Sequence, residues 1–225
     1  MQEYFIRPIA LSDEVENNPK LNAEREIYYL LKKQIEENSN PFNCSLFYNS
    51  VWQEDKKQQV YNDGECDFII ANKDGVLFIE VKGGIVSYDE KNHQWYSSNS
   101  KGKFKIQDPI EQVKRSEKFY RNKLIEKFYE KHNERRWIRV KRAVILPYIR
   151  REKFSLGAIA SDKIFLFSED KDYLLGKCMK ILLHEPDKGS GNYDEFGQEG
   201  VRFLKNLIGQ SYEFKPAVLA LKLRE

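Results

Sequence analysis

The sequence GECDFIIANKDGVLFIEVKGG, residues 64–84, contains two apolar runs separated by the polar segment NKDG at residues 72–75. A short polar turn that ends in glycine between two such runs predicts a β-hairpin. If the register is symmetric about this turn, Asp67 lies directly opposite Glu80. Two carboxylates then face each other at the far end of the predicted hairpin.

The second apolar run ends in the triplet Glu80-Val81-Lys82, whose first and third residues are charged. Side chains alternate across a strand, so Glu80 and Lys82 project from one face while the aliphatic residues between and before them take the other. Like charges opposite each other destabilise a sheet, so Asp67 and Glu80 need a cationic partner, which a divalent metal ion would supply. The alternative interpretation is an ion pair between Glu80 and Lys82 at a solvent-exposed sheet edge.

The composition indicates one intracellular domain. With 225 residues, 40% of them hydrophobic, the chain can bury one good core. We expect residues 1–20 to form an N-terminal extension and residues 21–225 a single domain with a C-terminal helical elaboration. The three cysteines show no metal-ligand spacing, and no apolar run approaches the ~18 residues of a membrane span. We therefore expect a cytoplasmic protein that does not enter membranes.

Helical and extended patterns alternate along the chain. An apolar stripe predicts a first helix near Asn22–Glu37, and Asp108 followed by Pro109 marks the start of a long second helix. Together with the strand patterns, this alternation predicts an α/β fold whose sheet is covered by helices on both faces. The candidates for disorder are two polar stretches, residues 12–18 and 185–200.

Positive charge is concentrated in the second helix and just after it. Residues 114–142 contain twelve Lys or Arg against four Glu, interleaved with aromatic residues, as in surfaces that follow a phosphate backbone. The alternative is an amphipathic helix with a solvated lysine face. The candidate nucleic-acid contacts are Lys114, Arg115, Lys118 and Arg121 on the helix, with Lys101 and Lys103 in the segment before it.

Several motifs occur in an order that resembles a known family. They are Ala23-Glu24-Arg25, Gly64-Glu65-Cys66-Asp67, the run GVLFIEVKG at residues 75–83, Trp95, and the sequence DPIEQ at residues 108–112. An Asp on one strand followed by Glu-x-Lys on the next resembles the PD-(D/E)XK nuclease superfamily, and the whole set resembles its nuclease-related (NERD) domains. Cys66 stands where the superfamily name has a proline, a departure that NERD-type sequences commonly share. The resemblance implies a restriction-endonuclease-like fold, with a central mixed β-sheet flanked by helices.

The resemblance also implies a metal-dependent phosphodiesterase, and the residue types suit one. Lys82 is expected to position or deprotonate the attacking water and to stabilise charge on the phosphate. Gln112 is expected to contact DNA or to orient the site. The oxygen ligands expected for Mg²⁺ or Mn²⁺ are Asp67, Glu80, the Val81 carbonyl and Glu24, the last through a bound water or a second ion.

The leading hypothesis is a DNA endonuclease or nickase, and family association adds a place beside a helicase in DNA processing or phage defence. No Walker-type sequence occurs, so these residues contain no helicase motor. One alternative is a non-catalytic nucleic-acid-binding module, which would not need Asp67, Glu80 and Lys82 together. Another is a nuclease directed at RNA, since phosphate contacts do not distinguish the sugars. Cleavage of both strands requires two sites, hence a homodimer or two successive nicks.

Overall fold

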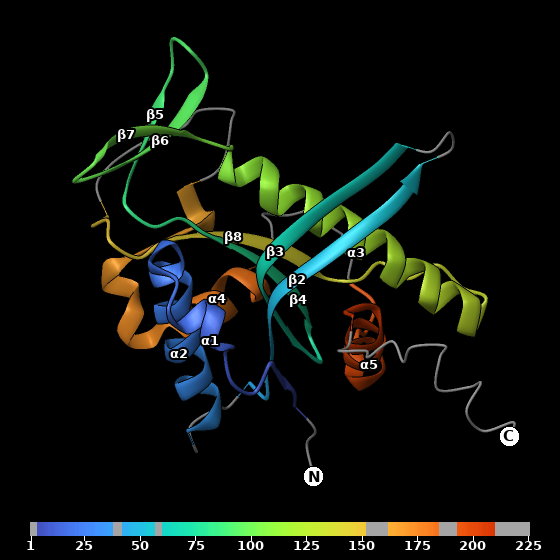
Figure 1. Ribbon diagram of the computed structural model, residues 1–225. Coiled ribbons are helices and arrows are strands. Elements are labelled where there is room, and N and C mark those ends of the chain that lie inside the picture. Colours follow the sequence, from blue (N-terminus) through green and yellow to red (C-terminus); the bar gives the residue numbers. More distant parts are fainter. Residues whose placement is uncertain (1–3, 38–41, 57–59, 152–161, 185–192, 210–225) are drawn as a thin grey trace, which may run out of the picture.

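The structure is a computed structural model that describes residues 4–37, 42–56, 60–151, 162–184 and 193–209. The strands of its central sheet are β1 (Ile6–Arg7), β2 (Ser45–Lys56), β3 (Val60–Asn72), β4 (Gly75–Val81), β8 (Val140–Leu146) and β9 (Phe165–Phe167). They lie side by side in the order β1-β2-β3-β4-β8-β9, and Figure 1 labels the four central strands β2, β3, β4 and β8. The β2–β3 and β3–β4 pairs are antiparallel, whereas β1–β2, β4–β8 and β8–β9 are parallel. The predicted α/β fold with a mixed central sheet is confirmed.

The β3–β4 hairpin adopts the predicted register. Its Cα pairs run from Asn72–Gly75 at the turn to Phe68–Ile79. Gly75 has a φ of 151°, and a Cβ atom there would lie 2.3 Å from the carbonyl oxygen of Arg139. Only glycine therefore fits where the hairpin passes the chain that leads into β8.

Helices cover both faces of the central sheet (Figure 1). They are α2 (Asn22–Glu36) and α4 (Leu174–Leu183) on one face, and α3 (Pro109–His132) and α5 (Gly197–Leu207) on the other. Because side chains alternate along β3, Phe68 and Ile70 pack toward α2 and α4, whereas Ile69 packs toward α3 and α5. Asp108 caps the start of α3, as predicted. Among the described residues, no helix is both long enough and apolar enough to cross a bilayer.

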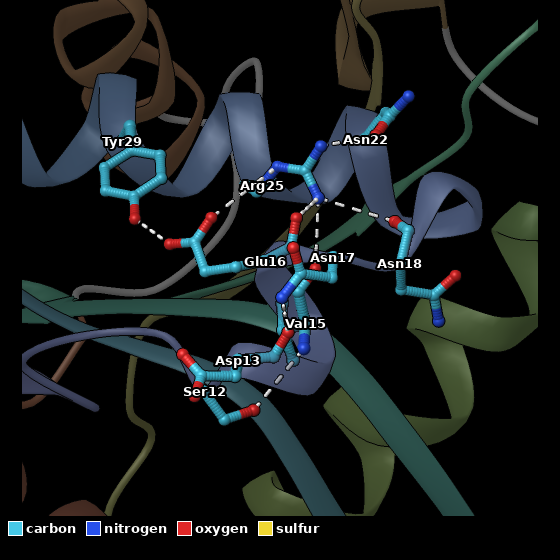
Figure 2. Close-up of polar contacts among 9 residues, drawn as sticks. All are labelled: Ser12, Asp13, Val15, Glu16, Asn17, Asn18, Asn22, Arg25 and Tyr29. Carbon is cyan, nitrogen blue, oxygen red and sulfur yellow. Dashed lines mark hydrogen bonds and ion pairs between the residues drawn. The ribbon is translucent and has the colours of Figure 1, made fainter.

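Residues 12–18, a candidate for disorder in the sequence, are held by Arg25 of α2. Ser12 caps the short helix α1 (Asp13–Glu16), and a 3-10 helix (Pro19–Leu21) leads into α2. The Arg25 guanidinium donates hydrogen bonds to three backbone carbonyl oxygens, those of Val15 (3.0 Å), Glu16 (2.6 Å) and Asn18 (3.4 Å) (Figure 2). The expectation was wrong because a side chain of the next helix satisfies the polar backbone of this segment.

The second candidate for disorder is also partly structured. Residues 185–192 lie outside the described residues. Phe196, however, is buried in the core beside α3, and α5 begins at Gly197. The expectation of disorder was wrong for residues 193–200, because Phe196 within this Gly-rich sequence packs against an apolar surface.

A small three-stranded sheet follows β4 directly, at the upper left of Figure 1. Its strands are β5 (Ile85–Asp89), β6 (Gln94–Asn99) and β7 (Gly102–Ile106). Gly84, with a φ of 78°, makes the turn out of β4, and Ser97 of β6 donates a hydrogen bond from Oγ to the carbonyl oxygen of Gly83 at 3.0 Å. The small sheet is thereby attached to the charged end of β4.

Candidate active site

The end of the β3–β4 hairpin brings two carboxylates together. Asp67 and Glu80 lie next beyond the last ladder pair, and only 8% and 2% of their surfaces are exposed. The Oδ2 atom of Asp67 accepts a hydrogen bond from the backbone N–H of Val81 at 2.7 Å. The Asp67 side chain thus accepts a hydrogen bond from the backbone of β4, and this bond fixes its carboxylate close to Glu80.

Strands β2 and β3 are both distorted at the level of Asp67. Cys66 packs in the core on the α3 side and Phe68 in the core on the α2 side, although residues two apart on a regular strand share a face. On β2, Asn49 falls opposite Asp67 and has a φ of 49°, in the left-handed region. The carboxylate is therefore placed by a break in the strand, which a simple alternation rule does not predict.

Lys82 completes the charged end of β4. Its Nζ atom lies 2.5 Å from Oε1 of Glu80, and 21% of its side chain is exposed. Burial by itself lowers the pKa of Lys82, but the carboxylates of Glu80 and Asp67 outweigh burial and hold that pKa above its usual value. The ion pair between Glu80 and Lys82 exists, but the interpretation as a solvent-exposed pair was wrong because Glu80 is buried. A second carboxylate, that of Asp67, also interacts with the lysine.

Helix α2 brings Glu24 to the same site. A Cβ atom on Gly83 would lie 3.1 Å from the Cβ of Ala23, so small residues at both positions let the helix approach the end of β4. Oε2 of Glu24 accepts a hydrogen bond from the Tyr48 hydroxyl at 3.2 Å. Burial, and after it the charge of Asp67, raises the pKa of Glu24 to about 7. Nothing in the sequence singles out Tyr48, because a tyrosine in an apolar strand is typical of packing.

The carboxylates of this site raise one another's pKa values. Burial raises the pKa of Asp67 to about 8, with the charge of Glu80 as the next cause. The pKa of Glu80 is raised as well, again chiefly by burial. Glu65, an exposed acid two residues before Asp67, adds to the negative potential at Glu24, Asp67 and Glu80 alike. Without a bound cation, the site therefore favours protonated carboxylates at pH values where ordinary acids are ionised.

The free oxygens of this site suit a cation that is held partly by water. The described residues contain no group of three or more His, Cys, Asp or Glu side chains that could hold a metal ion by themselves. Within the same residues, Oδ1 of Asp67 and Oε2 of Glu80 receive no hydrogen bond, so each acid keeps one oxygen available. Mg²⁺ commonly binds one or two carboxylates and retains several waters. Asp67 and Glu80 could hold such an ion, with the Val81 carbonyl beside them and Glu24 acting through water.

Gln112 lies in the first turns of α3, on the side of the helix that faces β3. Ser116, one turn later, donates a hydrogen bond from Oγ to the backbone carbonyl oxygen of Glu65 at 3.0 Å. The Oε1 atom of Gln112 is buried and has no hydrogen-bond partner among the described residues. Buried polar atoms are rarely left unpaired, so this oxygen is a candidate contact for a ligand or water near the carboxylates.

The predicted nucleic-acid contacts are spread over exposed surfaces and are not gathered at the carboxylates. Three are exposed on α3: Lys114, Arg115 and Lys118. Two are exposed beside the small sheet: Lys103 on β7 and Lys101 in the turn that precedes it. Arg121, by contrast, forms an ion pair with Glu117, a buried acid that also binds Arg142 at 2.5 Å. The structure therefore gives Arg121 an internal partner, while the nucleic-acid roles of all six residues stay predictions.

The raised pKa values predict how the metal-free protein responds to pH. The folded state raises the pKa of Asp67 to about 8, whereas an unfolded chain has ordinary values of about 4 for its carboxyl groups. The folded state then binds more protons between these values, so Asp67 lowers the free energy of unfolding as pH rises through this window. Asp67→Asn removes this decrease in the free energy of unfolding, while the amide oxygen can still accept the hydrogen bond from the Val81 N–H.

Urea unfolding in the presence of a chelator, at about pH 5 and about pH 8, tests this expectation. The stability of Asp67→Asn relative to wild type should increase by at least about 1.4 kcal/mol between the two conditions, the equivalent of one pKa unit. Asp63→Asn, which changes an exposed acid on the same strand, is the matched control and should show no such increase. A difference that stays constant or shrinks toward high pH would contradict the assignment.

One comparison with known proteins covers this whole site. The family model described as nuclease-related domain (NERD) matches residues 20–147, a range that contains Glu24, Asp67, Glu80, Lys82 and Gln112. Comparison with curated proteins and with solved structures gave no match. Because the matched range is more than half of the 225 residues and includes the complete charged end of the hairpin, the chain belongs to the nuclease-related domain family.

Proposed function

We propose that this chain is a divalent-metal-dependent phosphodiesterase that cleaves DNA as an endonuclease or nickase. Membership of the NERD family supports a nuclease-related function. The observation that carries the finer proposal is the burial of Asp67 and Glu80 together at the hairpin end, with Lys82 within 2.5 Å of Glu80. A bound cation would stabilise two buried acids that repel each other, and a phosphate placed beside that cation would also face the lysine.

Each side chain of the site has a role that follows from its charge and position. Mg²⁺ or Mn²⁺ on Asp67 and Glu80 would supply Lewis-acid stabilisation of the phosphate and a more acidic water. Lys82 stays protonated because the facing carboxylates raise its pKa, so its cation stabilises negative charge on the phosphate and does not act as the base. Glu24, whose pKa is raised to about 7, is suited to accept the proton that the attacking water gives up.

A binding module without catalysis is disfavoured by the same observation. Nucleic-acid binding requires positive charge and hydrogen-bond donors, and neither Asp67 nor Glu80 supplies them. Their burial destabilises the metal-free protein, which a surface used only for binding does not require. We extend the proposal to a role beside a helicase in DNA processing or phage defence, as the family resemblance implies.

Substitution of either buried acid should abolish metal-dependent cleavage while the protein stays folded. Asp67→Asn and Glu80→Gln each keep the size of the side chain and remove one ligand charge, so turnover should fall by at least about 10²-fold. Cleavage of supercoiled plasmid, linear duplex, single-stranded DNA and RNA, with Mg²⁺, Mn²⁺ or chelator, measures activity and substrate together. Asp63→Asn should cleave like wild type. Activity that persists in either acid variant, or in chelator, would sink the proposal.

Lys82→Ala separates the role of the lysine from that of the ligands. Since Asp67 and Glu80 remain, metal affinity should be kept or should rise, because a cation beside the metal has been removed. Turnover at saturating metal should still fall by about 10²-fold or more. Titration with Mn²⁺ and single-turnover cleavage measure the two effects, with Lys73→Ala in the exposed hairpin turn as control. Lost metal binding with normal residual turnover would instead make Lys82 an organiser of the carboxylates.

The exposed basic face of α3 should contribute to DNA binding through phosphate contacts. Changing Lys114, Arg115 and Lys118 together to Gln should weaken binding with little sequence dependence and should flatten the salt slope by up to about 0.9 per lost contact. Arg121 is left unchanged because Glu117 holds it. Lys20, Lys33 and Lys91, exposed elsewhere, provide a control triple variant with the same change in net charge. Equal effects of the two triple variants would show that only net charge matters.

A further inference from the structure

A cavity opens at the edge of the central sheet where β9 covers only part of β8. The β9 strand pairs with Val144–Leu146, so the first half of β8 has no β9 partner along this edge. Here a half-open cavity of about 710 Å³ is lined by side chains of β8, β9, α4 and the 3-10 helix Asp162–Ile164, together with Arg151, Asp170 and His184. This volume lies within the range typical of small-molecule sites.

The cavity is strongly basic. Among the described residues, six Lys or Arg side chains and one His line it, against one acid, Asp170. Asp170 is already bound by three donors: Arg151 (2.8 Å), the backbone N–H of Phe167 (2.9 Å) and Lys177 (3.2 Å). Glu117, from outside the cavity, binds Arg142. Lys141 and Lys180 therefore add positive charge that no acid among the described lining residues offsets.

The other part of the lining is apolar. Ile164, Phe165 and Leu166 supply it from the β9 side, and Ile181 supplies it from α4. Cationic side chains beside apolar ones complement a molecule that carries both phosphate groups and a flat organic ring. Nucleic-acid strands, in contrast, follow extended grooves with aromatic side chains as stacking platforms. We propose that this cavity binds a nucleoside phosphate.

The cavity is distinct from the candidate active site. Among its described lining residues, none is Glu24, Asp67, Glu80 or Lys82. Phe165 pairs with Val144, which in turn pairs with Glu80, so the cavity edge lies two strands, about 10 Å, from the buried acids. A ligand here would contact the strand next to β4 without occupying the metal site. The proposal therefore does not depend on cleavage activity.

Calorimetric titration of the full chain with ATP, in chelator so that no hydrolysis at the metal site intervenes, tests the proposal. We expect saturable binding that Lys141→Glu with Lys180→Glu weakens at least tenfold, about the effect of 1.4 kcal/mol. Lys20→Glu with Lys91→Glu, at exposed positions elsewhere, gives the same change in net charge and should leave affinity unchanged. If the double variant does not fold, Lys180→Ala on the exposed face of α4 replaces it and should weaken binding in the same direction.

Two further titrations define the ligand class. Pyrophosphate carries the phosphate charge without the ring, so it should bind more weakly than ATP. A short DNA oligonucleotide should not displace ATP. The proposal is overturned by absence of saturable ATP binding, by equal binding of pyrophosphate and ATP, by displacement with the oligonucleotide, or by equal losses in the two charge-reversal variants.

Discussion

Repulsion between two carboxylates that the fold holds out of water is the interaction on which this site depends. Asp67 and Glu80 are brought together because the β3–β4 hairpin has a fixed register and Asp67 receives the N–H of Val81. Burial would favour neutral acids, as their raised pKa values show, while Lys82 compensates for only part of the negative charge. A divalent cation is the physical agent that would convert this unfavourable arrangement into a stable one.

The surrounding elements serve to keep that arrangement rigid. Ala23 against Gly83 sets the distance between α2 and the end of β4, and the same helix presents Glu24 to Tyr48. Arg25, the next residue, fastens the chain that precedes α2 (Figure 2). The Ala-Glu-Arg motif thus has one residue for packing, one for the site and one for the N-terminal segment. Positioning by packed helices and strands is what a preorganised site requires.

The hairpin, its register and the α/β class could be predicted from the sequence, because a polar turn between apolar runs and a capped helix are local signals. The sequence was sufficient to predict that Asp67, Glu80 and Lys82 lie together, because charged residues in an apolar strand conflict with burial, whereas their roles in metal binding and catalysis stay predictions. Disorder was wrongly predicted for residues 12–18, which Arg25 holds in place, and for the stretch that contains Phe196, which packs against α3. Tyr48 was likewise missed, since a contact between distant segments leaves no periodic pattern. The Arg121–Glu117 pair has the i,i+4 spacing of one helix, but no local pattern indicates that Glu117 is buried and also binds Arg142 of β8.

We propose that Asp67 and Glu80 form one cation site built into the hairpin end. The most direct test is a calorimetric titration of the metal-free protein with Mn²⁺ at about neutral pH. The proteins compared are wild type, Asp67→Asn and Glu80→Gln. We expect saturable binding to wild type and at least about a tenfold loss of affinity in each variant. Absence of binding to wild type, or unchanged affinity in both variants, would contradict it.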